Sequence, residues 1–164
     1  MPKVQYTTAK GLYQESGSGV VLPRKMPVVD LDGTTYAPTV AESGTLFTFD
    51  GTACTVTLPT CEAGLVYEFV CDTTAAADAV ITTQTADKLY GVVACVVDGI
   101  QVAMSNSTAI MDCNTGVNDN TFTMNGTTKG GIVGSHIRVV GMAGNKWHIS
   151  GHKIGSGTLV TSFS

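Results

Sequence analysis

The chain has 164 residues, of which only 22 are charged: 9 Lys or Arg and 13 Asp or Glu, a net charge of −4. This charged content of 13% is about half of the roughly 25% usual in soluble domains, while a hydrophobic content of 43% argues against disorder. The few basic residues are scattered, so no nucleic-acid partner is expected. The longest apolar run, Val92–Val97, is far shorter than the ~18–20 residues that span a membrane, so no membrane partner is expected either.

Residues 1–40 are predicted to form an extended N-terminal arm. Gly17–Gly19 is a flexible element, and Pro23 and Pro27 oppose regular structure. The arm nevertheless carries apolar anchors, which a polar disordered tail would lack: Tyr6, Leu12, Tyr13, Val20, Val21 and Leu22. We expect the arm to order against a neighbouring surface. The alternative, an N-terminal strand that packs into its own sandwich, stays open.

Residues 41–164 are predicted to form one β domain. Strand signals recur there every 8–12 residues, the spacing of a sandwich or barrel. Apolar and polar residues alternate over 54–58, 65–71, 137–140 and 147–150, which predicts strands with one buried face. The apolar run 92–97 indicates a strand covered on both faces. Helix signals are nearly absent, since the Ala-rich stretch 75–79 is too short to nucleate a helix.

Glycine turns are predicted between these strands, at Asp50-Gly51, Asp98-Gly99 and Ala143-Gly144-Asn145. The second would lead into a further strand at 100–104, and Pro59 ends a strand. The fold class predicted from these signals is all-β: an antiparallel β-sandwich of jelly-roll or β-tulip type.

The cysteines stand at irregular spacing, at positions Cys54, Cys61, Cys71, Cys95 and Cys113. No pair forms a Cys-x-x-Cys motif, so neither a zinc site nor a thioredoxin-like site is encoded. The start of the chain lacks the apolar region of a signal peptide. We therefore expect reduced, buried thiols and synthesis in a reducing cytoplasm.

Two groups of residues offer metal-ligand chemistry. His148 and His152 have the spacing of a helical metal site, but on a strand they would lie ~13 Å apart, which favours a structural or surface role. The segment 112–120 alternates Asp and Asn as a calcium loop does. Because Val117 and Thr123 replace the glycine and the bidentate glutamate of such a loop, an Asx-rich turn is favoured.

The sequence contains no motif for catalysis. There is no Gly-x-Ser-x-Gly elbow and no P-loop, and most Asp residues stand beside Gly or Thr in predicted turns. The single tryptophan, Trp147, lies in an alternating strand and is expected in the core rather than on a glycan-stacking platform. We therefore expect neither enzymatic activity nor a cofactor. A small hydrolase on a sandwich scaffold ranks third, behind the two functions given below.

Two stretches resemble segments of tailed-bacteriophage virion proteins. The first runs from Gly44–Phe49 through Thr55–Thr60 to Ala63–Val70, and the second joins Gly134–Val140 to Asn145–Gly151. The first stretch has the order strand, Thr-Leu-Pro, small loop, Gly, aromatic strand. The second has the order Gly-x-x-Ile-x-Val, glycine turn, Lys-Trp-x-Ile-x-Gly. This pattern is similar to phage head decoration (cement) proteins and also occurs in distal domains of phage fibres. Similarity covers residues 5–155, and residues 9–19 look like the arm that precedes such a domain.

The resemblance implies a β-rich, usually trimeric domain on a virion surface, made in the cytoplasm of a bacterial host. We expect a decoration protein that binds the outside of the assembled capsid and stabilises it. Its partners would be the major capsid protein and further copies of itself, contacted by the six apolar arm residues. The alternative is a tail or head fibre domain that recognises a host glycan or protein. It ranks second because the chain, taken as complete from Met1, has no fibrous repeat.

Overall fold

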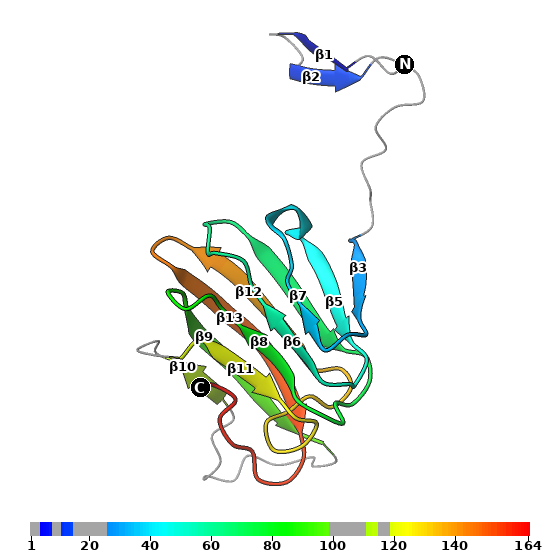
Figure 1. The fold of residues 1–164 in the computed structure, drawn as a ribbon, viewed down its shortest axis with the longest axis vertical. Helices are drawn as coiled ribbons and strands as arrows, with labels where there is room; N and C mark the ends of the chain where they lie inside the picture. The colour runs from blue at the N-terminus through cyan, green and yellow to red at the C-terminus, as the bar shows by residue number, and fades with distance from the viewer. Residues whose placement is uncertain (1–3, 8–10, 15–25, 99–110, 115–118) are drawn as a thin grey trace.

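The computed structural model describes residues 4–7, 11–14, 26–98, 111–114 and 119–164. Their regular structure is all-β apart from one short 3-10 helix, η1 (Val40–Glu42), so the all-β part of the predicted fold class is confirmed, whereas its antiparallel jelly-roll or β-tulip type is not (Figure 1). No helix in these ranges is long and apolar enough to cross a membrane.

The strands of the described residues form three sheets. The largest has seven strands in the order β10 (Met111–Asn114), β9 (Lys88–Val97), β13 (Lys146–Gly155), β12 (His136–Met142), β7 (Val66–Cys71), β5 (Thr45–Phe49) and β3 (Val28–Leu31). The second has four, in the order β11 (Thr121–Met124), β8 (Ala79–Thr82), β6 (Cys54–Thr57) and β4 (Thr35–Tyr36). The third is the pair β1 (Val4–Thr7) and β2 (Gly11–Gln14).

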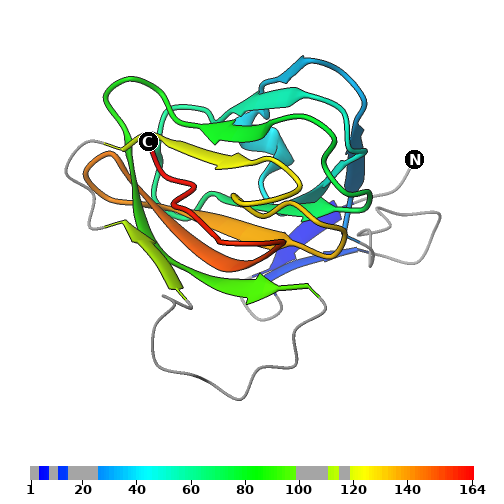
Figure 2. The ribbon, with the colours of Figure 1, turned by 90° about the horizontal axis from the view of Figure 1, so that it is seen from below.

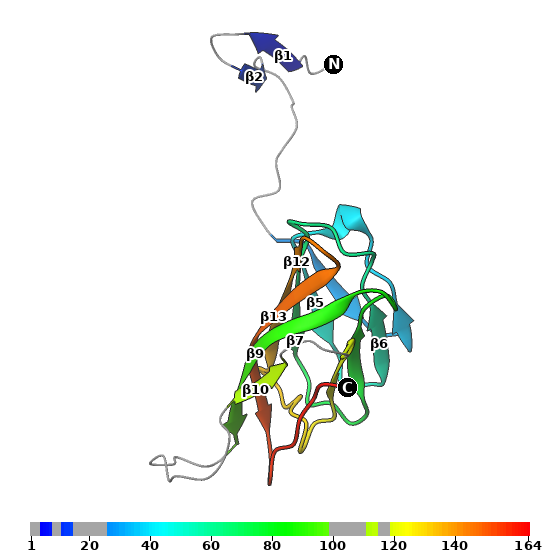
Figure 3. The ribbon, with the colours of Figure 1, turned by 90° about the vertical axis from the view of Figure 1, so that its left-hand side faces the viewer.

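The seven-stranded and four-stranded sheets face each other as two layers around one core (Figures 2 and 3). Alternation along the strands sends every second side chain inward, as the burial of β5 and β7 shows. Trp147 is fully buried beside Tyr67, with ring centroids 5.9 Å apart, so its predicted place in the core is confirmed. The other large, fully buried side chains include Phe47, Phe49, Phe69, Phe122, Leu58, Ile81 and Leu89.

The first six strands of this body form three successive arches. β3, β5 and β7 lie in one sheet, whereas the strands that follow them, β4, β6 and β8, lie in the other. The corresponding strands therefore run parallel, and Leu31, Phe49 and Cys71 fall side by side at their ends. Each arch starts with an Asp that stands two residues before a Thr: Asp32 and Thr34, Asp50 and Thr52, Asp72 and Thr74. In the second arch the Asp50 carboxylate accepts bonds from the Thr52 N–H and hydroxyl, which shapes the turn.

The prediction that all strands of the sandwich pair antiparallel is wrong. Five strand pairs are parallel: β3–β5, β5–β7, β4–β6, β6–β8 and β9–β13. The physical reason is that Asp50-Gly51 is an arch between the two sheets and not a hairpin within one of them. The turn at 143–145 is a hairpin as predicted, with Gly144 and Asn145 at positive φ between β12 and β13. Gly99 and the predicted strand at 100–104 lie outside the described residues.

The predicted boundary after residue 40 falls inside the two-layer body. β3 and β4 are strands of its sheets, and Leu31 belongs to its core. For residues 28–36, the alternative of a strand packed into its own sandwich therefore holds. The arm residues Tyr6, Leu12 and Tyr13 lie on an antiparallel hairpin in which Tyr6 pairs with Leu12. Val20, Val21 and Leu22 lie outside the described residues.

The carboxylate of Glu42 in η1 stabilises the fold at neutral pH, and this contribution is lost in acid. The Tyr36 hydroxyl and then the Thr39 N–H and hydroxyl donate to its carboxylate, and these bonds lower the pKa of Glu42 below its ordinary value of 4.5. A lowered folded-state pKa contributes stability above pH ~4.5 that is lost as the pH falls through that pKa. We expect Glu42→Gln to melt below the wild type at pH 7 and the difference to vanish in acid. Melting curves from pH 7 to pH 2 check this, with exposed Glu62→Gln as control; a pH-independent difference would contradict it.

Candidate functional site

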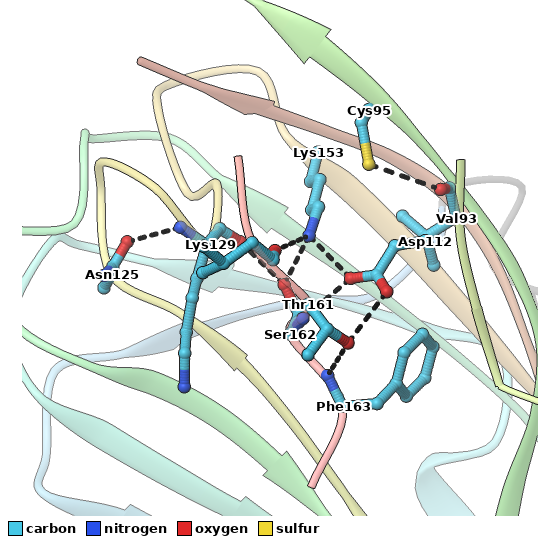
Figure 4. Close-up of polar contacts among 10 residues, drawn as sticks. Val93, Cys95, Asp112, Asn125, Lys129, Lys153, Thr161, Ser162 and Phe163 are labelled. Carbon is cyan, nitrogen blue, oxygen red and sulfur yellow. Dashed lines mark hydrogen bonds and ion pairs between the residues drawn. The ribbon is translucent and has the colours of Figure 1, made fainter. Parts of the chain in front are cut away.

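A cluster of buried polar groups lies where the last residues of the sequence meet β10, β11 and β13 (Figure 4). Its centre is an ion pair between Lys153 of β13 and Asp112 of β10, with 2.6 Å between Nζ and Oδ2. The Lys153 side chain is fully buried, and that of Asp112 is 8% exposed. Lysine and aspartate are rarely buried to this extent unless they are paired, so the pair marks a built site rather than a chance surface contact.

Both ions of the pair have a full set of partners. Lys153 Nζ donates to Asp112 Oδ2, to the Val160 carbonyl at 3.0 Å and to Ser162 Oγ at 2.8 Å, which accounts for all three ammonium donors. Asp112 Oδ2 also accepts the Ser162 N–H at 2.7 Å, and Oδ1 accepts the Thr161 hydroxyl at 2.9 Å. Such complete bonding offsets the desolvation of two charges, which otherwise costs several kcal/mol per ion.

The position of Lys153 follows from the alternation of its strand. Trp147, Ile149 and Gly151 precede it at every second position of β13, and Gly155 follows it, so its stem points inward. Gly130 leaves the space that this stem fills: a Cβ at that position would lie 2.6 Å from Cβ of Lys153. The ammonium then reaches past the core to the edge of the four-stranded sheet.

The terminal segment, residues 160–164, closes the cluster by pairing with the free edge of β11. The N–H of Thr123 donates to the Ser162 carbonyl at 2.9 Å, and Thr121 and Ser164 exchange two backbone bonds at 3.0 and 3.1 Å. Phe163 is 7% exposed and packs edge-on against Phe122, with ring centroids 5.1 Å apart. The segment therefore sits in a slot, the terminal slot, formed by Asp112, Phe122, Lys129, Lys153 and the edge of β11.

The terminal slot holds its segment through backbone bonds at a sheet edge and through side-chain contacts, which are also the contacts used in β-strand peptide binding. Ser162 and Lys153 form a Ser–Lys contact, which in other settings could activate a nucleophile. Here the Ser162 hydroxyl donates to the Lys129 carbonyl at 2.8 Å, while the ammonium is held by Asp112. Both groups therefore bind the segment, and neither is placed to transfer a proton to a substrate. The slot contacts a hydroxyl side chain, an aromatic side chain and an extended backbone.

In the two groups that offer metal-ligand chemistry, Asp112 and His152 are bonded to other groups of the protein. Both carboxylate oxygens of Asp112 are bonded to protein donors, and residues 115–118 of the calcium-like segment lie outside the description. Within the described ranges, no group of three or more His, Cys, Asp or Glu could hold a metal ion. His148 is exposed on β13, and His152 bonds the Gly134 carbonyl at 2.9 Å through Nε2.

The outward surface of the seven-stranded sheet, here called the outer face, is the second feature of interest. No described element covers it, as the view along the sheets shows (Figure 3). Val28, Val92 and Val96 are exposed there to 61%, 40% and 47%, so the prediction that strand 92–97 is covered on both faces is wrong for the described residues. Half-buried apolar residues surround them at outward positions: Leu46, Val66, Val70, Tyr90, Val140 and Ile154.

Charged side chains on the outer face lie at its margins or are paired. Glu68 and Arg138 approach within 3.4 Å near the centre, and His136 lies 3.3 Å from the same carboxylate. Asp30 stands on the edge strand β3, and Lys146 begins β13. The exposed valines therefore lie on β3 and β9, on either side of a paired charged cluster at the centre of the sheet.

The described thiols are free, and burial raises the pKa of each. Burial raises the pKa of Cys71 to about 12 and, to a smaller extent, raises the pKa of Cys54, Cys61 and Cys95. At pH 8 only about one Cys71 side chain in 10⁴ is a thiolate, the reactive form. We expect Cys54 and Cys71 to resist iodoacetamide in the native protein and to react fully in denaturant. Peptide mass mapping checks this, and rapid native labelling of Cys71 would contradict it.

The chain has no match among protein-family models, curated proteins or solved structures. Neither the arm residues nor the resemblance pointed to the terminal slot. One signal in the sequence could have indicated the slot: Lys153 occupies an inward position of β13, in line with the buried Trp147 and Ile149.

Proposed function

We propose that this protein is a decoration, or cement, protein of a tailed phage. It binds the outside of the assembled capsid as a homotrimer, contacts the major capsid protein and stabilises the shell. It is made in the cytoplasm of the bacterial host and resides on the virion surface. The proposal combines the sequence resemblance with one structural observation, the outer face that no described element covers and on which Val28, Val92 and Val96 are exposed.

The dimensions of the outer face suit a protein interface. Seven strands spaced ~4.8 Å apart span roughly 30 Å, and a strand of five residues is roughly 17 Å long. The product is about 500 Å², a large part of the ~800 Å² that each partner contributes to a standard interface. Removing apolar surface from water contributes ~25 cal/mol per Å², and symmetry multiplies each contact over the lattice.

The ion pair on the outer face favours the same role. Glu68 already bonds Arg138 and His136 within the chain, so covering this cluster would cost less than covering an unpaired charge. Desolvating an unpaired ion costs several kcal/mol, which a weak surface contact does not offset.

The N-terminal arm supplies the remaining contacts in this proposal. Its apolar residues Tyr6, Leu12, Tyr13, Val20, Val21 and Leu22 would contact the capsid or a neighbouring subunit. A test of this must end the deletion at residue 25, because Leu31 belongs to the core. We expect the chain lacking residues 1–25 to fold and to bind heads more weakly; undiminished binding would remove the arm from the proposal.

A charge placed on the outer face tests the proposal. Val96→Glu introduces a carboxylate on the face at a side chain that is 47% exposed. Val40→Glu is the matched control, because Val40 is 46% exposed but lies in η1. In cosedimentation with heads of the cognate capsid protein, we expect Val96→Glu to lose most binding and Val40→Glu to keep it. Equal binding by both variants would contradict the proposal, and selective binding to a host glycan would favour a fibre domain.

A further inference from the structure

The terminal slot is built entirely from residues that precede the segment it holds. Asp112, Phe122, Lys129 and Lys153 supply its side-chain and carbonyl contacts, and β11 supplies its backbone edge. The segment is joined to this body through residues 156–159, of which 156–158 are exposed. Every contact in the slot would be the same if the segment came from another copy of the chain.

An empty slot would destabilise the protein, because the groups that line the slot would lose the partners that the segment supplies. Without the segment, Lys153 would lose the Val160 and Ser162 acceptors, and Asp112 would lose the donors of Thr161 and Ser162. Phe122 would lose its ring partner, and β11 would become an unpaired sheet edge. An occupant must therefore supply an extended strand with Thr, Ser and Phe in this order. The segment supplies them as Thr161-Ser162-Phe163, and a second copy carries the same sequence.

We propose that the terminal slot is a peptide-binding site that takes the terminal segment of a second copy in the assembled oligomer. Exchange of identical strands is a low-cost way to join subunits, because the exchanged contacts already exist in each subunit. Strand addition at a sheet edge provides the backbone bonds, and the pockets for Ser162 and Phe163 provide the specificity. The inference rests on the proposed homotrimer.

A disulfide trap reports which copy fills the slot. Thr121 and Ser164 exchange both backbone bonds, so their Cα atoms lie ~5.5 Å apart, within the range of a disulfide. The variant Thr121→Cys/Ser164→Cys is oxidised and run on a non-reducing gel. We expect covalent multimers up to the trimer that collapse to monomer on reduction. Because the chain has native thiols, each single variant is the control and should yield no such ladder.

Two further measurements make each outcome decisive. If light scattering shows a wild-type trimer but the trap gives only monomer, exchange is overturned while the proposed oligomer stands; a wild-type monomer overturns the oligomer itself. If the cysteine variant does not fold, Lys153→Met and Phe163→Ala chains are refolded together. If segments are exchanged, the slot of a Phe163→Ala chain can hold the unaltered segment of a Lys153→Met chain. Some slots then carry no substitution, and the mixture should show a melting component near that of the wild type. A curve equal to the sum of the two separate variants overturns exchange.

Discussion

Replacing Lys153 by Met is expected to lower the free energy of unfolding by about 3–5 kcal/mol. The substitution keeps most of the apolar stem but leaves the Asp112 carboxylate 8% exposed and without its cation. It also removes the donor that holds Val160 and Ser162, so the terminal segment should loosen from β11. Chemical denaturation should show the loss, and protease cleavage near residue 160 should become faster.

Two controls separate the buried pair from charge loss in general. Arg138→Met breaks the Glu68 pair on the outer face, where the arginine is 46% exposed, and should cost less than ~1 kcal/mol. The double variant Lys153→Met/Asp112→Leu removes both buried ions, so it should be more stable than Lys153→Met alone. A cost for Lys153→Met no larger than that for Arg138→Met would show that the pair does not hold the segment.

Replacing Gly91 by Ala is expected to cost about 2–4 kcal/mol, from overpacking and from a strained backbone. Gly91 lies in β9 between β10 and β13 and has a φ of 147°. A Cβ there would fall 1.9 Å from the carbonyl oxygen of Ile149, so the β9–β13 pairing must shift to admit it. Thermal and denaturant unfolding measure the effect.

Gly44→Ala is the matched control for Gly91→Ala. Gly44 also has a positive φ, 87°, but a Cβ there would meet nothing within 4 Å. It should therefore cost only the backbone strain, ~1–2 kcal/mol. An equal cost at both positions would show that the close approach of β9 and β13 does not limit the fold.

The sequence predicts the strands of this protein well, because alternation and turn residues are local signals. The strands around Val56, Phe69 and Trp147 lie where alternation places them. The partner of each strand depends on whether a turn stays within one sheet or crosses to the other, and Asp-Gly fits both geometries. The recurrence of Asp and Thr at 32–34, 50–52 and 72–74 was the one local sign of stacked arches, since equivalent turns repeat at equivalent corners.

The terminal slot was harder to predict, because its members are far apart in the sequence. Asp112 stands in a segment rich in Asp and Asn, which suggested a calcium loop or a turn. Only the fold brings it beside Lys153 and Ser162. The alternation of β13 could have identified Lys153 as a buried cation in need of an anion, but not which carboxylate it would meet.

The most direct test of the proposed function is cosedimentation of the wild-type protein with expanded and unexpanded heads of the cognate capsid. In the proposal, the uncovered outer face and an arm expected to order on binding suit a site created when the shell expands. The proposal predicts saturable binding to expanded heads, weak or no binding to unexpanded heads, and greater resistance of the decorated heads to heat. Absence of binding to both kinds of head would contradict a role as a decoration protein.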